Sequence, residues 1–141
     1  MSLSGQDKNC VLTLHDVYTE EIVLQRSDEY SKRDSELEFN IGYSYNEGSD
    51  NKFKITIKVN IEDVKKSALN LTIGVSGVFE LKSNKGSNLD LTKNAIAILF
   101  PYVRSNLTNI TSQSGIETLI LPVINFNALL DEQRKKLEEE K

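Results

Sequence analysis

Apolar and polar residues alternate with a period of two along much of the first half of the chain. Three stretches carry this alternation, at residues 37–45, 53–61 and 69–81. Successive side chains of a β-strand point to opposite faces of a sheet, so each stretch predicts a strand with one apolar and one polar face. The Gly-containing stretch 46–51 predicts a hairpin between the first two strands, and the polar stretch 62–68 predicts the turn before the third.

A further strand is predicted upstream, over residues 10–25. Its alternation slips phase around Asp16–Glu21, which indicates an irregularity in the strand. The polar segment 26–35 that follows is too long for a tight turn and fits a connection from one edge of a sheet to the other. We therefore expect a sheet of four antiparallel strands over residues 10–82, with the last three as a meander and the first joined to them by a crossover.

Helical periodicity replaces the alternation after a loop at 82–90. Apolar residues recur at i, i+4 and i+7 spacing from Ile96 to Ile110 and predict a helix over about 91–113, which ends at Ser114-Gly115. Pro101 either kinks this helix or lies in the first turn of its main part.

A C-terminal helix is predicted over 127–138, after the apolar stretch at 121–126, which could also dock on the sheet edge as a short fifth strand. The expected fold class is α+β: a four-stranded antiparallel sheet followed by a long helix and a C-terminal helix. One domain would span residues 10–138, preceded by a disordered N-terminus at 1–9.

The long helix carries more apolar surface than one sheet can cover. Between Ala95 and Val103, apolar side chains extend nearly all the way round the predicted helix. A helix that is apolar all round is buried on all sides, so we expect a second copy of the chain to cover the side opposite the sheet. The residues assigned to this oligomer interface are Ile96, Leu99, Val103 and Leu107.

Composition excludes several classes of function. The chain has 141 residues, with 17 basic and 21 acidic side chains and a net charge of −4, which argues against nucleic acid as a partner. The longest strictly apolar run, at 95–100, is far shorter than the roughly 20 residues of a membrane span, so no membrane insertion is expected. The N-terminus lacks an apolar stretch of signal-peptide length, so we expect a cytoplasmic protein.

Candidate chemistry is sparse. Cys10 and His15 are each the only residue of their kind, so the chain offers neither a disulfide nor a Cys/His zinc site of its own. The sequence has no phosphate-binding Gly-rich loop and no plausible catalytic Ser/His/Asp or Cys/His set. We therefore expect no metal, no cofactor and no enzymatic activity.

Two motifs resemble SecB, the protein-export chaperone family of bacteria. They are ILFPYVR at 98–104 and LPVINFNALL at 121–130, with SQSG between them where the family has a Ser-Arg-Gly type of break. DVYTEEI at 16–22 and SGVFEL at 76–81 are weaker matches. The resemblance is collinear over about residues 10–130 and is specific in the last third.

This resemblance implies a tetramer built as a dimer of dimers, with the long helices sandwiched between sheets. It also implies an ATP-independent holdase that binds unfolded or newly synthesised polypeptides in apolar grooves and passes them on, typically to the SecA motor, for export. By resemblance, the residues that line the client-binding groove are Leu37, Phe39, Ile41, Phe100, Tyr102, Ile116, Leu119 and Leu121. For each of them the alternative is an ordinary place in the core.

The sequence also departs from the family. SecB contacts SecA through carboxylates on the sheet, and only Glu21 keeps the charge here, since Gln25, Asn70 and Thr72 stand at the other positions. The crossover is polar, with Tyr30 as its sole aromatic residue. Both departures fit a SecB-like chaperone dedicated to the antitoxin of a toxin–antitoxin system. A further alternative is a non-chaperone oligomer that binds a ligand or has a structural role.

Overall fold

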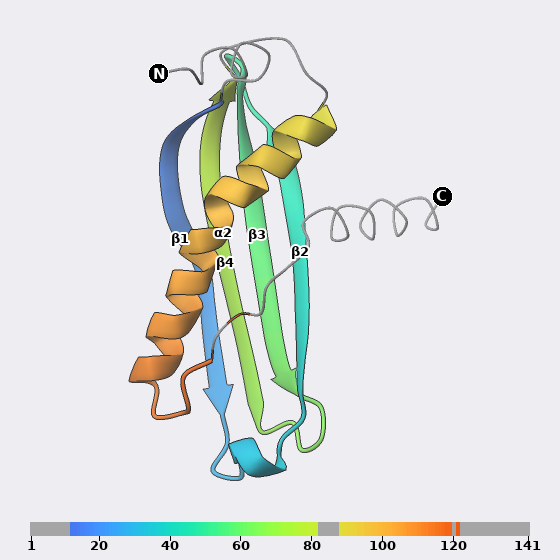
Figure 1. The fold of residues 1–141 in the computed structure, drawn as a ribbon, viewed down its shortest axis with the longest axis vertical. Coiled ribbons are helices and arrows are strands. Elements are labelled where there is room, and N and C mark those ends of the chain that lie inside the picture. The colour runs from blue at the N-terminus through green and yellow to red at the C-terminus, as the bar shows by residue number, and fades with distance from the viewer. Residues whose placement is uncertain (1–11, 82–87, 120, 122–141) are drawn as a thin grey trace, which may run out of the picture.

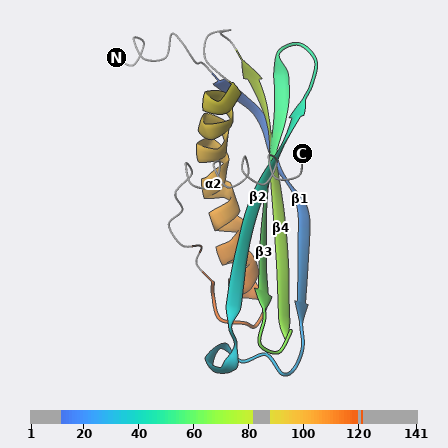
Figure 2. The ribbon, with the colours of Figure 1, turned by 90° about the vertical axis from the view of Figure 1, so that its right-hand side faces the viewer.

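The computed structural model describes residues 12–81, 88–119 and 121. Along the chain its elements are β1 (Leu12–Arg26), a 3-10 turn (Lys32–Asp34), β2 (Leu37–Glu47), β3 (Lys52–Asp63), β4 (Leu69–Leu81) and α2 (Asn88–Gln113). The strands form one layer, and α2 packs against one face of it (Figures 1 and 2). Two predictions, a disordered N-terminus at 1–9 and a C-terminal helix at 127–138, concern residues outside the described ones.

The four strands pair in the order β1-β4-β3-β2 and are antiparallel throughout. This confirms the predicted meander of β2, β3 and β4. It also confirms the crossover, because β1 and β2 are consecutive in sequence and lie at opposite edges of the sheet (Figure 1). The predicted irregularity in the first strand is present as well, as register shifts between Leu14 and Asp16 and between Thr19 and Glu21.

The alternating pattern decides which side chains meet the helix. On β3 the apolar positions from Phe53 to Ile61 are all buried, and their neighbours on β4 from Leu71 to Phe79 complete the same face. Near the β2–β3 hairpin an aromatic row crosses three strands, with Tyr45 stacked on Phe53 at 5.3 Å between ring centroids and Phe53 on Phe79 at 5.6 Å. The core therefore lies between the sheet and α2.

The other face of the sheet is polar. Lys54 Nζ lies 2.8 Å from Glu20 Oε1, and the two joined strands are not neighbours in the sheet, since β4 lies between them. Beneath them the small side chains of Thr56 and Ser76 share a hydrogen bond of 2.8 Å. The hydrogen bond from Lys54 holds the pKa of the Glu20 carboxyl below its usual value. This face is thus a layer of compensated charges.

Helix α2 begins at Asn88, three residues before the predicted start, and part of the predicted loop at 82–90 is helical. It ends at the predicted place, and Gly115 has φ +74, a left-handed conformation that favours glycine just past a helix. Pro101 lies well inside one continuous helix, so the alternative that places it in a first turn is excluded.

Gly77 on β4 lets the helix approach the sheet closely. A Cβ atom at this position would lie 2.6 Å from Cδ2 of Leu99 and 2.9 Å from Cε1 of Phe79, both too close for a real contact. Leu99 on α2 is itself fully buried. The missing side chain therefore forms a notch that receives Leu99 and fixes where the helix crosses the sheet.

Candidate functional site

An apolar strip follows the inner face of the edge strand β2. Leu37, Phe39, Ile41 and Tyr43 occupy alternate positions, pair with inward-facing positions of β3 and are half-buried against the core. We call these four residues the β2 strip. Helix α2 runs diagonally from the hairpin end of β2 and β3 to the far end of β1, so it does not cover the lower half of β2 (Figure 1). The strip is therefore the part of the core that the helix leaves open.

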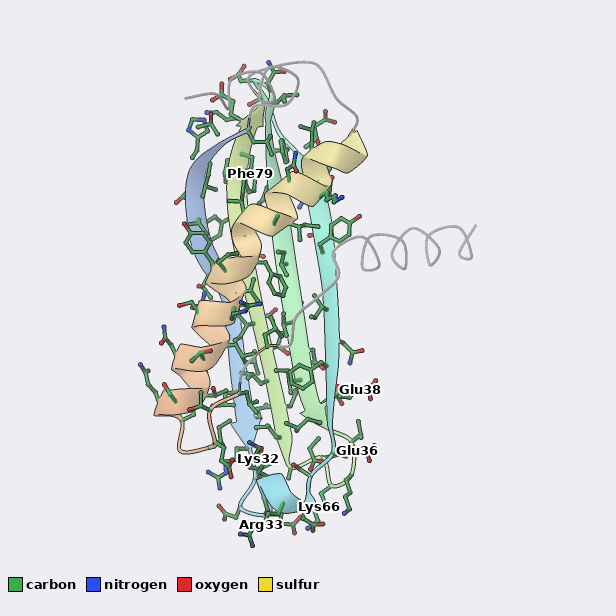
Figure 3. The ribbon with its side chains drawn as sticks, in the orientation of Figure 1. Lys32, Arg33, Glu36, Glu38, Lys66 and Phe79 are labelled. Atoms are coloured by element: carbon green, nitrogen blue, oxygen red, sulfur yellow. The ribbon has the colours of Figure 1, made fainter. Side chains whose placement is uncertain are left out.

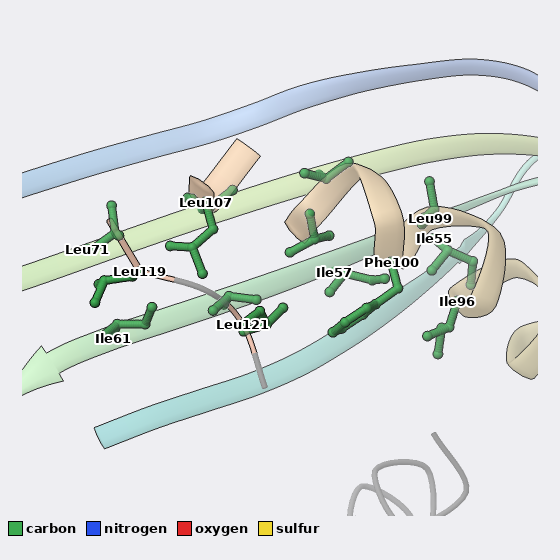
Figure 4. Close-up of a cluster of buried hydrophobic side chains, with 14 of the residues drawn as sticks. Ile55, Ile57, Ile61, Leu71, Ile96, Leu99, Phe100, Leu107, Leu119 and Leu121 are labelled. Atoms are coloured by element: carbon green, nitrogen blue, oxygen red, sulfur yellow. The ribbon is translucent and has the colours of Figure 1, made fainter. Parts of the chain in front are cut away.

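Three of the four strip residues were predicted to line a groove, whereas Tyr43 was not. The alternation that places Phe39 and Ile41 on this face extends directly to Tyr43, so the signal was present in the pattern. Phe100 was also assigned to the groove. It reaches from α2 down beside Ile57 and is buried within the chain (Figure 4).

A non-helical segment after α2 covers the sheet beside the strip. We call residues 115–119 together with 121 the docked segment. Its apolar side chains are buried, with 9% of Ile116, 6% of Leu119 and 2% of Leu121 exposed. Leu119 lies over Ile61 and Leu71, and Leu121 follows toward Phe100 (Figure 4). The three residues were predicted to line an open groove, but in the described chain they fill the sheet face themselves.

Few polar contacts hold the docked segment. The backbone N–H of Leu119 donates to Thr111 Oγ1 at 2.9 Å, and Arg26 Nη1 donates to the carbonyl of Gly115 at 3.0 Å. An exposed ion pair joins Lys32 Nζ to Glu117 Oε2 at 2.9 Å. Its hydrogen bond raises the pKa of Lys32. Such pairs contribute little to stability when both partners are solvated.

Two opposing free-energy terms act on the docked segment, the burial of its apolar side chains and the ordering of its backbone. Burying its three apolar side chains stabilises the docked state by roughly 5–9 kcal/mol, at about 1.5–3 kcal/mol each. Fixing the backbone of about six residues costs roughly 6–12 kcal/mol. The two terms are of similar size, so the ordering cost of the segment largely offsets its apolar burial.

The structure corrects the predicted oligomer interface. Ile96, Leu99, Val103 and Leu107 are completely buried within the single chain, because they face its own sheet. A second copy therefore has no access to them. The large apolar side chains of α2 that the described structure leaves exposed are instead Ile98 and Tyr102, at 38% and 43% exposure. Tyr102, which was predicted to line the groove, lies on this outer side of the helix.

Glu21, the predicted motor contact, lies on the polar face of the sheet. Its carboxylate pairs with Lys58 Nζ at 3.1 Å, so its charge is compensated. Gln25 stands opposite Asn70, and Asn60 Nδ2 donates to both Asn70 Oδ1 and Thr72 Oγ1 at 2.9 Å. The four positions that the family resemblance singled out thus form a patch with little net charge.

A buried carboxylate, Asp63, lies at the end of β3 and was not predicted from the sequence. It is 1% exposed and accepts hydrogen bonds from the backbone N–H groups of Glu36, Lys65, Lys66 and Ala68 at 3.1–3.3 Å. Burial opposes ionisation, but the four donors outweigh it and keep the pKa of Asp63 below its usual value. The carboxylate joins the start of β2 to the β3–β4 turn, at the end of the sheet where Glu36 and Lys66 lie (Figure 3).

The described part of the chain was compared with the requirements of a metal site and of a membrane span. No group of three or more His, Cys, Asp or Glu side chains among residues 12–81, 88–119 and 121 is arranged to hold a metal ion. In the same residues no helix has the length and apolar character of a membrane span.

Two known proteins resemble this chain in sequence. A protein of Methanocaldococcus jannaschii named "Uncharacterized protein MJ0357" is 31% identical over 115 residues, which cover 73% of this chain and 72% of that protein. The "Protein-export protein SecB" of Anaplasma phagocytophilum is 33% identical over 88 residues, 57% of this chain and 56% of its own length. That match therefore spans little more than half of the relative.

A solved structure shares the fold. The Mycobacterium tuberculosis Rv1957 SecB-like chaperone, in complex with a ChAD peptide from the Rv1956 HigA1 antitoxin, superposes with a TM-score of 0.62 over 81% of this chain and 88% of that chain, at 12% identity. Residues 5–137 match the family described as "Preprotein translocase subunit SecB". The match covers nearly the whole sequence, and the chain has a four-stranded sheet with a crossover connection and a long helix across it. The chain therefore belongs to the SecB family.

Proposed function

We propose that the protein is an ATP-independent chaperone, a holdase that binds unfolded or newly synthesised polypeptides in the cytoplasm. The observation that carries the proposal is the β2 strip, four half-buried apolar side chains along an open sheet edge in a family of export proteins. Apolar side chains of an unfolded client gain free energy when they leave water for such a surface. No nucleotide and no metal is needed for this step.

Edge strand β2 offers a second, sequence-tolerant contact. Its outer edge has no neighbouring strand among the described residues, because β2 is the last strand in the sheet order. An extended client segment can hydrogen-bond to such an edge while its alternate side chains contact the strip. The client site proposed here comprises Leu37, Phe39 and Ile41 together with the adjoining surface at Phe100, which Ile116, Leu119 and Leu121 cover in the free chain.

Two roles are possible for the chaperone, and they differ in the protein that receives the client. In the export role, the chaperone passes its client to SecA, and Glu21 is a point of contact. The compensation of Glu21 by Lys58 favours the second candidate function, a chaperone dedicated to one partner such as an antitoxin. The fold shared with the antitoxin-bound Rv1957 chaperone is consistent with that candidate.

The protein is proposed to act as a homo-oligomer, with a dimer of dimers as the expected form. The exposed side chains of Ile98 and Tyr102 on α2 supply the apolar contact with a second copy. Replacing both with Asp should reduce the particle mass measured by light scattering, because two charges would be buried in the interface. An unchanged mass would place the interface elsewhere.

The holdase proposal is tested by aggregation of an unrelated denatured enzyme, measured by light scattering without nucleotide. The protein should suppress aggregation at stoichiometric amounts. The double substitution Phe39→Ser with Ile41→Ser should remove most of this suppression, because it makes the strip polar. The matched control, Asn40→Ser, changes the intervening residue on the opposite face of β2 and should leave suppression unchanged. Wild-type protein that fails to suppress aggregation would instead favour a structural or ligand-binding oligomer.

A further inference from the structure

The docked segment has the properties of a bound client. It is non-helical, carries three apolar side chains at 116, 119 and 121, and lies on the same sheet face as the β2 strip. All three side chains are buried, and Leu119 lies over Ile61 and Leu71 while Leu121 lies toward Phe100 (Figure 4). An unfolded polypeptide that binds along the strip and extends across the sheet would meet this same surface.

The contacts of the docked segment are suited to release. Its only backbone hydrogen bond to a side chain of α2 in the described residues is that of Leu119 N–H with Thr111 Oγ1. Gly115 and Glu117 are bonded to Arg26 at the end of β1 and to Lys32 in the 3-10 turn, and both of these residues are exposed. The apolar burial and the ordering cost of the segment are of similar size and offset each other, so a competing polypeptide has little net stability to overcome.

We propose that residues 115–119 and 121 form an internal competitor of the client, which occupies part of the binding surface in the free protein and leaves it when a client binds. This inference rests on the proposed holdase function and adds regulation to its site. The consequence is selectivity by size. A short apolar peptide contacts only the β2 strip, whereas a long unfolded segment contacts both the strip and the surface that the docked segment vacates. The apparent affinity is scaled by the fraction of molecules in which the segment is released.

Tethering the segment tests the proposal directly. In a Cys10→Ser background, Lys32→Cys with Glu117→Cys is joined by a short bis-maleimide, which replaces the ion pair with a covalent link. The matched control joins Asp34→Cys and Lys65→Cys, another exposed pair at 2.8 Å that does not involve the segment. Affinity is measured by fluorescence anisotropy with labelled, reduced and carboxymethylated lactalbumin, which stays unfolded. Mass spectrometry confirms each cross-link.

Loosening the segment should have the opposite effect. Thr111→Val removes the oxygen that accepts the Leu119 N–H, so the docked state is left with an unpaired donor, whereas the released state bonds to water. Client affinity should rise by about two- to tenfold, the range that corresponds to one hydrogen bond. The control, Thr56→Val, loses a hydrogen bond to Ser76 on the opposite face of the sheet and should not change affinity.

The outcomes separate the two proposals. Weakening of lactalbumin binding by at least fivefold in the tethered protein, with no change in the control pair, supports the internal competitor. Equal affinity before and after tethering overturns it and leaves the holdase function standing. Absence of lactalbumin binding by the untethered wild-type protein overturns the holdase function, and the inference with it.

Discussion

The notch at Gly77 gives the sharpest quantitative prediction. Gly77→Ala adds a methyl group where Leu99 Cδ2 would lie at 2.6 Å, Phe79 Cε1 at 2.9 Å and Leu99 Cγ at 3.2 Å. Leu99 and Phe79 are both fully buried, so neither side chain has free space to turn into. The added methyl must therefore displace α2 from the sheet or force Leu99 out of its rotamer.

The expected loss of stability is the difference between two opposing terms. Overpacking of a well-packed core costs about 1–3 kcal/mol. Alanine reduces the conformational freedom of the unfolded chain, which returns about 0.4–1 kcal/mol where the backbone conformation suits it, and Gly77 does not have a positive φ. The net destabilisation should be about 1–2 kcal/mol, measured from urea unfolding followed by circular dichroism at a fixed protein concentration.

A second glycine provides the control. Gly74 lies on the same strand but on the polar face, where an added Cβ would lie 3.5 Å from Cβ of Glu21, an ordinary contact. Gly74→Ala should therefore change the free energy of unfolding by no more than about 0.5 kcal/mol. Equal losses of stability from the two substitutions would mean that the cost arises from replacing any glycine of this strand and not from filling the notch.

A double-mutant cycle refines the test. Leu99→Ala alone should cost about 2–5 kcal/mol through lost burial and a cavity. When Gly77→Ala is added, the new methyl enters space that Leu99 vacates. The loss of stability in the double variant should therefore be smaller than the sum of the two single losses by at least about 1 kcal/mol. Additive effects would refute the reasoning that the two side chains compete for one space.

Three other substitutions test polar groups at the lower end of the sheet. Asp63→Asn should lower the urea midpoint at pH 7. The amide NH2 of asparagine is itself a donor, so it cannot accept the backbone N–H groups that now bond to the carboxylate. Since the folded pKa of Asp63 lies below its usual value, its contribution is present above about pH 4 and lost as pH falls through the folded pKa, so wild type and variant should converge in acid. Asp34→Asn is the contrast: Lys65 and Lys66 lower the pKa of Asp34 to about 2, but the group is half exposed and the midpoint should barely move. Tyr30→Phe should raise the stability by about 1 kcal/mol, because the buried hydroxyl has no hydrogen-bond partner among the described residues; a loss of stability would reveal a partner.

Much of the fold could be read from local pattern. Strand faces follow from a period of two, which depends only on neighbouring residues, so the buried positions of β3 and the inward row of β2 were predictable. The crossover also followed, because the polar segment at 26–35 is too long for a hairpin. Boundaries were less certain, as the earlier start of α2 at Asn88 shows.

The candidate site was predicted in part. Leu37, Phe39 and Ile41 share one face of β2, because their alternation is a property of one strand, whereas their role in client binding stays a prediction. Leu119 and Leu121 are apolar in a segment without regular structure, and the sequence does not say whether such residues line a surface or cover it. The structure shows them docked on the sheet of their own chain.

The sequence alone determined which residues are apolar, which faces of the strands they share and that the chain carries a long helix. The stripe from Ile96 to Ile110 indicated one apolar face of that helix, but between Ala95 and Val103 apolar residues surround it, so only the tertiary structure decided which of these side chains meet the sheet. The notch at Gly77, which lies on a different element, selects the side of Leu99 and leaves Ile98 and Tyr102 exposed. Contacts between distant elements depend on shape in three dimensions, and periodicity along one strand or helix carries no information about that shape.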